Sequence, residues 1–468
     1  MNPIIAFAPF LSVSAAIVLT IGAYIARWSP RIILAMLAIL LGLAWYSGFV
    51  ATQTNINIWG ISLDALGTFG FQLVLPSLFT ITVMSFNNSH ADKNIGSLLL
   101  ILLSGVGAIS VLISHNWMIL FVAIQCMSIP IYALISRDHK NPYAISSSMR
   151  YLLLSAIAMS FMLFGILLFY ADTQSFDFYA QAIRWRLDGI SPLSLFGIAF
   201  VLIGIAFKLS IFPFHIWAPQ VYQGAPFFTV ALMIVVSKSA VLLTFLRISL
   251  IYFDQSNSVS ITLSAMAIVS LWLGSGLMII EKNFLRFLAF LSISHMGFLF
   301  IAVMSQSIAG IEAVLLDLCA FSLGIFLVLL TLNSLPCRSS HIKNEDLKGL
   351  YFRCPLHSIA LLIGFFSITG FPLTAGFIGK FSIFSASIKA NLWMFLPHMV
   401  AASVLTFIAF IRLSLIMFQP VTEDQSLEKI PFSSIAIIAA LLTITLGIYP
   451  DPLIAWVKTY SSQLGILR

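Results

Sequence analysis

The sequence predicts an all-α membrane protein that crosses the bilayer many times. Of its 468 residues, 60% are hydrophobic and only 8% are charged, whereas soluble domains are about one-quarter charged. The mean hydropathy is +1.06. No soluble core could bury this much apolar surface, so the composition excludes a secreted disulfide-rich module, a disordered chain and a nucleic-acid binder. The net charge of +7 needs no polyanionic partner, because Lys and Arg gather in the cytoplasmic loops of membrane proteins.

The long apolar runs predict about fourteen transmembrane helices. A helix needs about twenty apolar residues to cross a hydrocarbon core about 30 Å thick, where backbone groups can be satisfied only internally. The predicted spans lie near residues 4–26, 32–51, 69–86, 97–114, 117–135, 151–171, 192–212, 227–250, 258–280, 285–304, 311–333, 357–386, 394–419 and 431–450. Basic residues follow the first span and do not precede it, which favours a retained helix over a cleavable signal peptide.

The positions of the basic residues predict the orientation of the spans. With fourteen spans both termini lie on one side, and the loops richer in Lys and Arg face the cytoplasm. The loops on the side away from the termini hold most of the basic residues, whereas the other loops hold few, among them Arg184, Arg186 and Arg247. We therefore predict that both termini are non-cytoplasmic. Four basic residues are assigned to no loop and lie within predicted spans: Lys208, Lys238, Lys380 and Arg412.

Three of these four basic residues, the lysines, are candidates for proton transfer. A charged lysine at the bilayer centre costs on the order of 3 kcal/mol, so its presence there suggests an ion pathway. Burial favours the neutral amine, which lets a lysine both bind and release a proton, as an arginine cannot. Arg412 lies near a predicted span end, where its long side chain can reach the interface.

Two histidines could extend such a pathway. His295, in Ser292-Ile-Ser-His-Met-Gly297, can pass a proton between its ring nitrogens, although a hydrogen-bonded structural role is equally compatible with its position. His215 follows Lys208 by seven residues, but Pro213 intervenes. We therefore place His215 at the end of the span.

Helix-breaking residues accompany two of the lysines. Phe207-Lys-Leu-Ser-Ile-Phe-Pro213 lies in the seventh predicted span, and Gly370-Phe-Pro-Leu-Thr-Ala-Gly-Phe-Ile-Gly-Lys380 lies in the twelfth. The breakers are Pro213, Gly370, Pro372 and Gly376. Backbone freed at membrane depth must be buried in protein or line water, and broken helices in matching halves indicate an inverted-repeat transporter. The alternative is a simple proline kink in each span.

Acidic and thiol side chains are too sparse for a metal site. Asp317 is the carboxylate lying well within a predicted span, and Glu312 lies near the start of the same span. Asp317 could pair with a lysine, relay protons or be buried in its protonated form. The four cysteines, Cys126, Cys319, Cys337 and Cys354, match no zinc or iron–sulfur spacing and are predicted to be free thiols.

Four strings closely resemble the N-subunit family of bacterial respiratory complex I (NADH:quinone oxidoreductase). They are Phe207-Lys-Leu-Ser-Ile-Phe-Pro-Phe-His-Ile-Trp-Ala-Pro-Gln-Val-Tyr-Gln-Gly-Ala-Pro226, Ser237-Lys-Ser-Ala240, Ser292-Ile-Ser-His-Met-Gly297 and Pro372-Leu-Thr-Ala-Gly-Phe-Ile-Gly-Lys-Phe381. The resemblance implies an antiporter-like fold of fourteen helices, with two inverted five-helix repeats and broken seventh and twelfth helices. It divides the chain into a three-helix segment (1–96), two antiporter-like halves (97–252 and 253–420) and a C-terminal helix with its tail (421–468).

The same resemblance implies a proton relay along Lys208, Lys238, His295 and Lys380. In the family, a glutamate on the fifth helix modulates the lysine on the seventh. The matching string, Phe121-Val-Ala-Ile-Gln-Cys-Met-Ser-Ile-Pro130, has Gln125 in that place. Gln125 cannot change charge, so the usual switch is missing and pumping through the first half is in question. His215, Asp317 and Arg150 are further candidate modulators.

Three functions follow as hypotheses. The first is a proton-translocating membrane-arm subunit of NADH:quinone oxidoreductase in a bacterial inner membrane, with both termini periplasmic and with other membrane-arm subunits and the lipid bilayer as partners. NAD, FMN, iron–sulfur clusters and quinone are expected on partner subunits, because this chain has no dinucleotide-binding fingerprint and no cluster spacing. The second is a subunit of an Mrp-type cation/proton antiporter or of a membrane-bound hydrogenase. The third, suggested by Gln125, is a structural subunit that does not pump.

Overall fold

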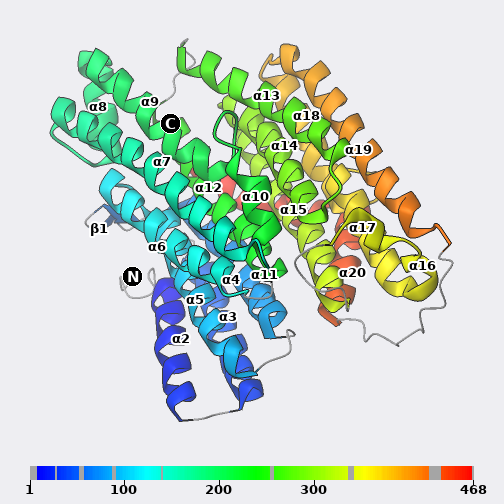
Figure 1. The fold of residues 1–468 in the computed structure, drawn as a ribbon. Helices are drawn as coiled ribbons and strands as arrows, with labels where there is room; N and C mark the ends of the chain where they lie inside the picture. Colours follow the sequence, from blue (N-terminus) through cyan, green and yellow to red (C-terminus); the bar gives the residue numbers. More distant parts are fainter. Residues whose placement is uncertain are drawn as a thin grey trace. The chain divides into compact units, whose positions relative to one another are not determined.

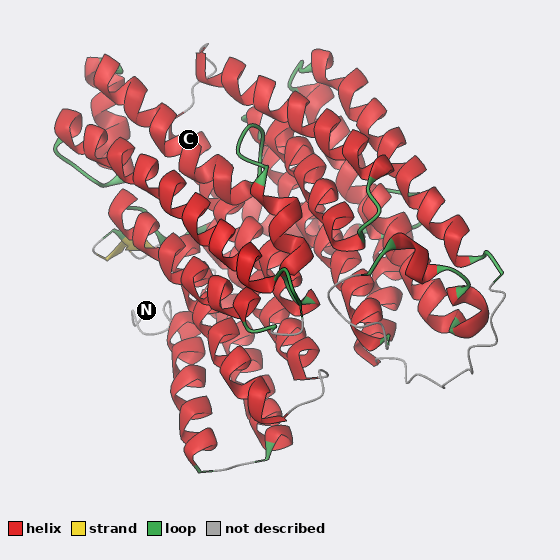
Figure 2. Cartoon of the chain, viewed as in Figure 1, coloured by secondary structure: helices red, strands yellow, loops and turns green. Residues whose placement is uncertain are grey.

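In the computed structural model, nearly every described residue belongs to a helix (Figure 2). The structure describes residues 8–26, 29–51, 57–58, 60–86, 91–138, 141–252, 258–335, 342–420 and 434–465. Besides helices, this part contains a short antiparallel hairpin of β1 (Asn57–Ile58) and β2 (Ile61–Ser62). The predicted all-α class is confirmed.

The chain forms two compact units. Unit 1 comprises Met1–His139, Ala144–Leu209 and Phe228–Asp254, and unit 2 comprises Lys140–Tyr143, Ser210–Phe227 and Gln255–Arg468. The division of the sequence into four segments stays a prediction.

Unit 1 contains the hairpin and most helices of the first half of the chain (Figure 1). The helices are α2 (Ala8–Ile25), α3 (Pro30–Ala51), α4 (Ala65–Phe86), α5 (Ala91–Ile113), α6 (Trp117–Ser136), α7 (Ala144–Thr173), α8 (Phe178–Asp188), α9 (Pro192–Leu209), α11 (Phe227–Ala231), the π-helix η1 (Leu232–Ser237) and α12 (Lys238–Tyr252). Aliphatic side chains of α2, α3 and α5, such as Leu37 and Leu98, pack into one core cluster. Helix starts are capped where the sequence offers a short polar side chain, as at Asn116 before α6 and Asp177 before α8.

Unit 2 is built around α14 and α15, whose side chains are almost all buried. Its helices are α10 (Trp217–Gly224), α13 (Ser258–Ile280), α14 (Phe284–Met304), α15 (Ile308–Ser334), η2 (Asn344–Leu347), α16 (Leu350–Arg353), α17 (Pro355–Thr369), α18 (Ala375–Lys389), η3 (Trp393–Phe395), α19 (Leu396–Met417), α20 (Ser434–Ile448) and α21 (Asp451–Gly465). A helix that is apolar on all sides is stable in this central position because other helices surround it.

The number of long apolar helices is that of a multi-pass membrane protein. Ten helices in the described part are long and apolar enough to cross a bilayer, three apolar helices are shorter, and the α20–α21 pair passes the same test with a bend of 82°. Fourteen spans therefore stay a prediction. The sequence missed α8 and α21, which are short and less apolar than the spans, and it placed the basic side chains of Arg184 and Arg186 in a loop although they lie on α8.

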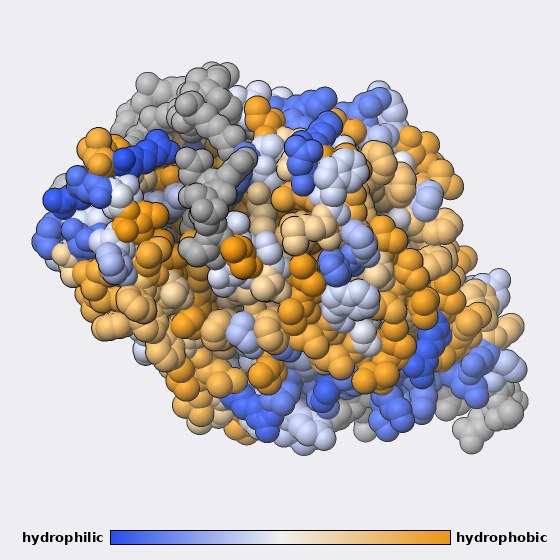
Figure 3. All heavy atoms as spheres, turned by 90° about the horizontal axis from the view of Figure 1, so that it is seen from above, coloured by the Kyte–Doolittle hydropathy of each residue, from blue (hydrophilic) through white to orange (hydrophobic). Residues whose placement is uncertain are grey.

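The outer surface fits a lipid environment. Apolar side chains cover much of the face seen in Figure 3, and large apolar residues such as Ile25, Leu187 and Ile280 are about 70% or more exposed. Arg412 is exposed and donates a hydrogen bond of 2.6 Å from Nη1 to the carbonyl oxygen of Ile279 on α13. Cys126, Cys319 and Cys354 are free thiols, and Cys337 lies outside the described residues.

Candidate functional site

Each of the three membrane lysines lies beside an interruption of a helix. Lys208 is in the last turn of α9, which ends at Leu209; the chain resumes helical structure at Trp217. Lys238 directly follows the π-helix η1. Lys380 lies on α18, which is separated from α17 by residues 370–374. Interruptions and π-helices within spanning helices often mark functional sites, because they place polar backbone groups inside the protein.

Neutral oxygen atoms and aromatic rings surround Lys208. Its side chain is 1% exposed. Nζ donates to Ser128 Oγ of α6 at 2.7 Å and to Ser155 Oγ of α7 at 3.0 Å. The ring of Tyr151 lies 5.0 Å from Nζ and that of Tyr132 lies 5.9 Å away. Hydroxyl acceptors and ring faces can stabilise an ammonium group without holding a fixed negative charge.

No carboxylate in the described part of the chain forms an ion pair with Lys208. Gln125, the residue at the position of the expected glutamate, lies one helical turn before Ser128 on α6. Its Oε1 is buried and makes no hydrogen bond within the described residues. An amide here cannot supply the charge of a glutamate, so the surroundings of Lys208 are neutral as well as buried.

The surroundings of Lys238 are equally buried. Its side chain is 1% exposed, and Ser237 and Ser239 on either side are buried as well. The spanning segment Phe227–Tyr252, which contains Lys238, is buried from Phe227 to Ser249. The π-helix immediately before Lys238 was not predicted, because the sequence of η1, Leu-Met-Ile-Val-Val-Ser, contains neither Gly nor Pro.

The break before Lys380 is built by glycines. Gly370 ends α17 in the left-handed region, with φ of 80°, a conformation that favours glycine. A Cβ on Gly376 would overlap the carbonyl oxygen of Ser367, so only glycine lets the start of α18 approach the end of α17 this closely. Pro372 lies in the exposed connection between them.

Lys380 binds the end of the helix that precedes this break. Nζ donates a hydrogen bond of 2.9 Å to the carbonyl oxygen of Thr369, the last residue of α17. The carbonyls of a last helical turn have no partners within the helix and carry partial negative charge. The ring of Phe298 on α14 lies 5.2 Å from Nζ. Unlike Lys208 and Lys238, Lys380 is only partly buried.

His295 and Asp317 form a buried pair in the same unit. His295 Nε2 lies 2.6 Å from Asp317 Oδ2, and both side chains are 4% exposed. The imidazole ring stacks on Phe321, with 3.5 Å between ring centroids. Asp317 also lies against Gly379, the residue before Lys380. Unit 2 thus brings an imidazole, a carboxylate and an amine together.

The remaining candidate residues, Pro213, His215 and Arg150, do not take part in the contacts described above for the three lysines and for His295. Pro213 and His215 lie in the connection between α9 and α10, where Phe212 N donates to Ser270 Oγ of α13 at 3.0 Å. His215 is half-buried. Arg150 lies on α7 with an exposed side chain.

One predicted placement was wrong. Arg247 was assigned to a loop, but it lies on α12, is 3% exposed and forms an ion pair with Asp64. Sequence reasoning missed this pair because the partners are 183 residues apart. It also missed the hydroxyls that bind Lys208, although Ser128 belongs to the same string as Gln125.

The described residues contain no group of three or more His, Cys, Asp or Glu side chains able to hold a metal ion. Together, the buried amines, the buried imidazole–carboxylate pair and the interrupted helices define a class of protein: a polytopic membrane protein whose interior holds titratable side chains, as ion-translocating proteins do.

Comparison with known proteins agrees with this class. Residues 114–406 match the family described as "NADH:quinone oxidoreductase/Mrp antiporter, TM". The chain is 34% identical over 370 residues to NADH-quinone oxidoreductase subunit N of Ectopseudomonas mendocina (strain ymp), which covers 76% of this chain and 74% of that protein. The chain therefore belongs to the NADH:quinone oxidoreductase/Mrp antiporter family, and the resemblance to the N-subunit family is confirmed.

Solved structures share the same fold. A chain of respiratory complex I from Thermus thermophilus with bound aureothin is 24% identical, with a TM-score of 0.81, 96% of this chain and 98% of that chain being covered. A chain of the membrane-bound sulfane sulfur reductase, an archaeal respiratory membrane complex, is 25% identical, with a TM-score of 0.84 and coverage of 98% and 97%. A chain of the Mrp complex from Dietzia sp. DQ12-45-1b is 18% identical, with a TM-score of 0.88 and coverage of 99% and 98%. The antiporter-like fold is thus confirmed.

Proposed function

We propose that this chain is a proton-translocating membrane-arm subunit of an NADH:quinone oxidoreductase in a bacterial inner membrane, with both termini periplasmic. The 34% identity to a subunit N supports this assignment over an Mrp antiporter or a hydrogenase subunit. The redox groups NAD, FMN, iron–sulfur clusters and quinone belong to partner subunits in this proposal. Neighbouring membrane-arm subunits and lipid are the contacts of this chain.

One observation carries the proposal: Lys208 and Lys238 in spanning helices and Lys380 on α18 all lie beside helix interruptions, and Lys208 and Lys380 bind neutral oxygens. An amine fixed by a carboxylate would hold its proton, because the ion pair stabilises the charged form. An amine held by hydroxyls or a backbone carbonyl is stabilised less, so its charge can change during a cycle. This property suits a relay.

The relay in this proposal consists of Lys208 and Lys238 in unit 1 and of His295 and Lys380 in unit 2. A charge or conformational change in a neighbouring subunit shifts the balance between ammonium and amine. An ammonium releases its proton to the next group and is reloaded from the other side. Asp317 can accept a proton from His295 over the 2.6 Å contact, so the pair can pass a proton with little movement.

Replacing Lys238 with alanine tests the proposal. In the assembled complex, Lys238→Ala is expected to lower the number of protons moved per electron while NADH still reduces quinone. Lys389→Ala is the matched control, because Lys389 is exposed at the end of α18. Measurement of proton uptake in vesicles together with NADH oxidation gives the ratio. An unchanged ratio in Lys238→Ala would remove Lys238 from the relay.

A structural role without pumping is the second candidate, and the neutral surroundings of Lys208 favour it. Gln125 offers no charge to Lys208, and no carboxylate in the described residues pairs with this lysine. Gln125→Glu would restore a carboxylate one helical turn from Ser128. A rise in protons per electron would support an active but weakened unit 1, and an unchanged ratio would favour the passive role for that unit.

A further inference from the structure

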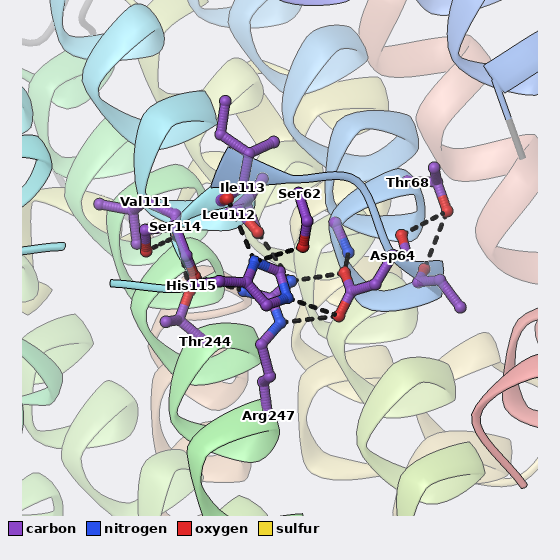
Figure 4. Close-up of polar contacts among 12 residues, drawn as sticks. Ser62, Asp64, Thr68, Val111, Leu112, Ile113, Ser114, His115, Thr244 and Arg247 are labelled. Atoms are coloured by element: carbon purple, nitrogen blue, oxygen red, sulfur yellow. Dashed lines mark hydrogen bonds and ion pairs between the residues drawn. The ribbon is translucent and has the colours of Figure 1, made fainter. Parts of the chain in front are cut away.

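A buried charged cluster joins three segments of unit 1 at one end of their helices. Asp64 lies directly before α4, His115 lies between α5 and α6, and Arg247 lies on α12 (Figure 4). Arg247 is 3% exposed, His115 is 1% exposed and Asp64 is 9% exposed. None of these residues belongs to the proposed relay, so their burial needs another explanation.

Asp64 caps the start of α4. Its Oδ1 accepts a hydrogen bond of 2.8 Å from the backbone N–H of Gly67, and its carbonyl oxygen accepts one of 2.9 Å from the N–H of Thr68. A carboxylate at this position binds unpaired N–H groups and faces the positive end of the helix dipole. Burial alone would raise the pKa of Asp64, but attraction to Arg247 and the hydrogen bonds from its guanidinium hold the pKa well below its usual range.

Arg247 caps the end of α5 from a different helix. Nε and Nη2 donate to the two carboxylate oxygens of Asp64 at 2.7 and 2.5 Å. The same guanidinium donates to the carbonyl oxygens of Leu112 at 2.7 Å and Ser114 at 3.2 Å. Carbonyls at the end of a helix otherwise lack partners and carry negative charge. One guanidinium thus binds a carboxylate at the positive end of α4 and carbonyls at the negative end of α5.

α12 carries both this cluster and Lys238. Thr244 Oγ1, between them on α12, also donates to the carbonyl oxygen of Val111 on α5 at 3.0 Å. Arg247 follows Lys238 by nine residues in one uninterrupted α-helix, a distance of about 14 Å along a rigid rod. On its other side Lys238 adjoins the π-helix η1. Contacts that hold the regular α-helical part of α12 in place, such as those of Thr244 and Arg247, can therefore fix the position of Lys238.

We propose that Asp64 and Arg247 are positioning residues for Lys238, because their ion pair fixes α12 against the end of α5 and the start of α4. This proposal rests on the proposed function of Lys238. A buried ion pair is weak support for stability in itself, since well-packed apolar residues often serve as well. A bidentate pair that also binds two helix ends fixes direction and register, which apolar contacts do less strictly.

Variants of the pair in the assembled complex test the proposal. Asp64→Asn keeps a side chain able to cap α4 but removes the charge that binds Arg247. Arg247→Gln removes the guanidinium, and Arg247→Lys keeps the charge without the bidentate fork. The matched control is Arg286→Gln, which breaks the partly exposed pair of Arg286 with Glu281 in unit 2. The amount of assembled complex, NADH-dependent quinone reduction and protons per electron are measured for each variant.

The positioning role predicts that Asp64→Asn and Arg247→Gln lower the protons moved per electron by roughly half or more of the fall in Lys238→Ala, since a shift of about 1 Å at a reacting group is costly. Arg247→Lys recovers part of the ratio, and Arg286→Gln leaves it unchanged. Less assembled complex with a normal ratio in that complex would mean a purely structural pair and would overturn the proposal.

The outcomes separate this proposal from the function on which it rests. A reduced ratio in Lys238→Ala together with a normal ratio in Asp64→Asn and Arg247→Gln overturns the positioning role alone. A normal ratio in Lys238→Ala overturns the relay role of Lys238 and with it the positioning role. If Asp64→Asn prevents assembly, Asp64→Glu and Arg247→Lys are used instead, because each keeps both charges of the pair. Each should displace α12 less and therefore lower the protons moved per electron by a smaller amount, and a normal ratio in both overturns the positioning role.

Discussion

Replacing Gly379 with alanine is expected to impair proton movement through unit 2 while leaving its helices in place. Gly379 precedes Lys380 on α18 and lies against α15. A Cβ at this position would lie 2.7 Å from Asp317 Oδ1 and 2.8 Å from Asp317 Cα. A rotation of the Asp317 side chain relieves the first contact only. The second involves backbone, so one helix must move away from the other.

The size of the movement follows from these distances. Carbon atoms in favourable contact are about 3.5–4.0 Å apart, so α18 must shift by about 1 Å from α15. A shift of this size along the hydrogen bond of Lys380 Nζ to the Thr369 carbonyl, now 2.9 Å, would bring it close to 4 Å, where it is no longer a hydrogen bond. Overpacking of this kind costs about 1–3 kcal/mol, of which the better helix propensity of alanine offsets about 0.5–1 kcal/mol.

The assay compares Gly379→Ala with Gly276→Ala in membrane vesicles that contain the assembled complex. An alanine Cβ at Gly276 on α13 meets no atom within 4 Å, so this control makes the same chemical change in open space. We expect Gly379→Ala to reduce quinone at a nearly normal rate but to move fewer protons per electron, and Gly276→Ala to match the native complex. Equal ratios in the two variants, with equal assembly, would refute the reasoning that close packing of α18 on α15 holds Lys380 in place.

Two further predictions concern unit 1. Ser155→Ala removes one of the two hydroxyl acceptors of Lys208; since a hydrogen bond to a charged group contributes about 1.5–3 kcal/mol, proton movement should slow by roughly tenfold or more. Ser160→Ala on the same helix, whose hydroxyl bonds its own backbone at an exposed site, should leave the rate unchanged, and equal rates in both variants would contradict the role of Ser155. Because the pKa of Asp64 is lowered in the folded state, its stabilising contribution is fully present above about pH 4 and is lost only as the pH falls through the folded-state pKa. Asp64→Asn should therefore lower the thermal unfolding temperature by a constant amount between pH 8 and 9, above the range in which histidine side chains such as His115, 3.7 Å from Asp64, usually change charge. A difference that shrinks within this range would count against the ion pair with Arg247 as its cause.

Much of the fold could be predicted from the sequence because its determinants are local. The length of an apolar run decides whether a helix can cross a bilayer, so most helices lie close to their predicted ranges. Gly370 and Pro213 lie in the two interruptions, because glycine favours the left-handed conformation that ends a helix and proline removes a backbone donor, although Pro76 and Pro130 lie inside α4 and α6. The π-helix before Lys238 could not be predicted, since its residues have no such local preference.

Within the candidate site, the sequence could give the titratable residues but few of their partners. The sequence determined that three amines and an imidazole lie within apolar segments. Burying a charge in such a segment is costly, so these residues could be recognised as candidates without knowledge of their partners. Only the tertiary structure decided that Ser128 and Ser155 bind Lys208, that Asp317 binds His295, and that Asp64 meets Arg247 across 183 residues. These contacts join helices far apart in the chain, and the packing of helices, not the spacing of residues along the sequence, determines which side chains meet.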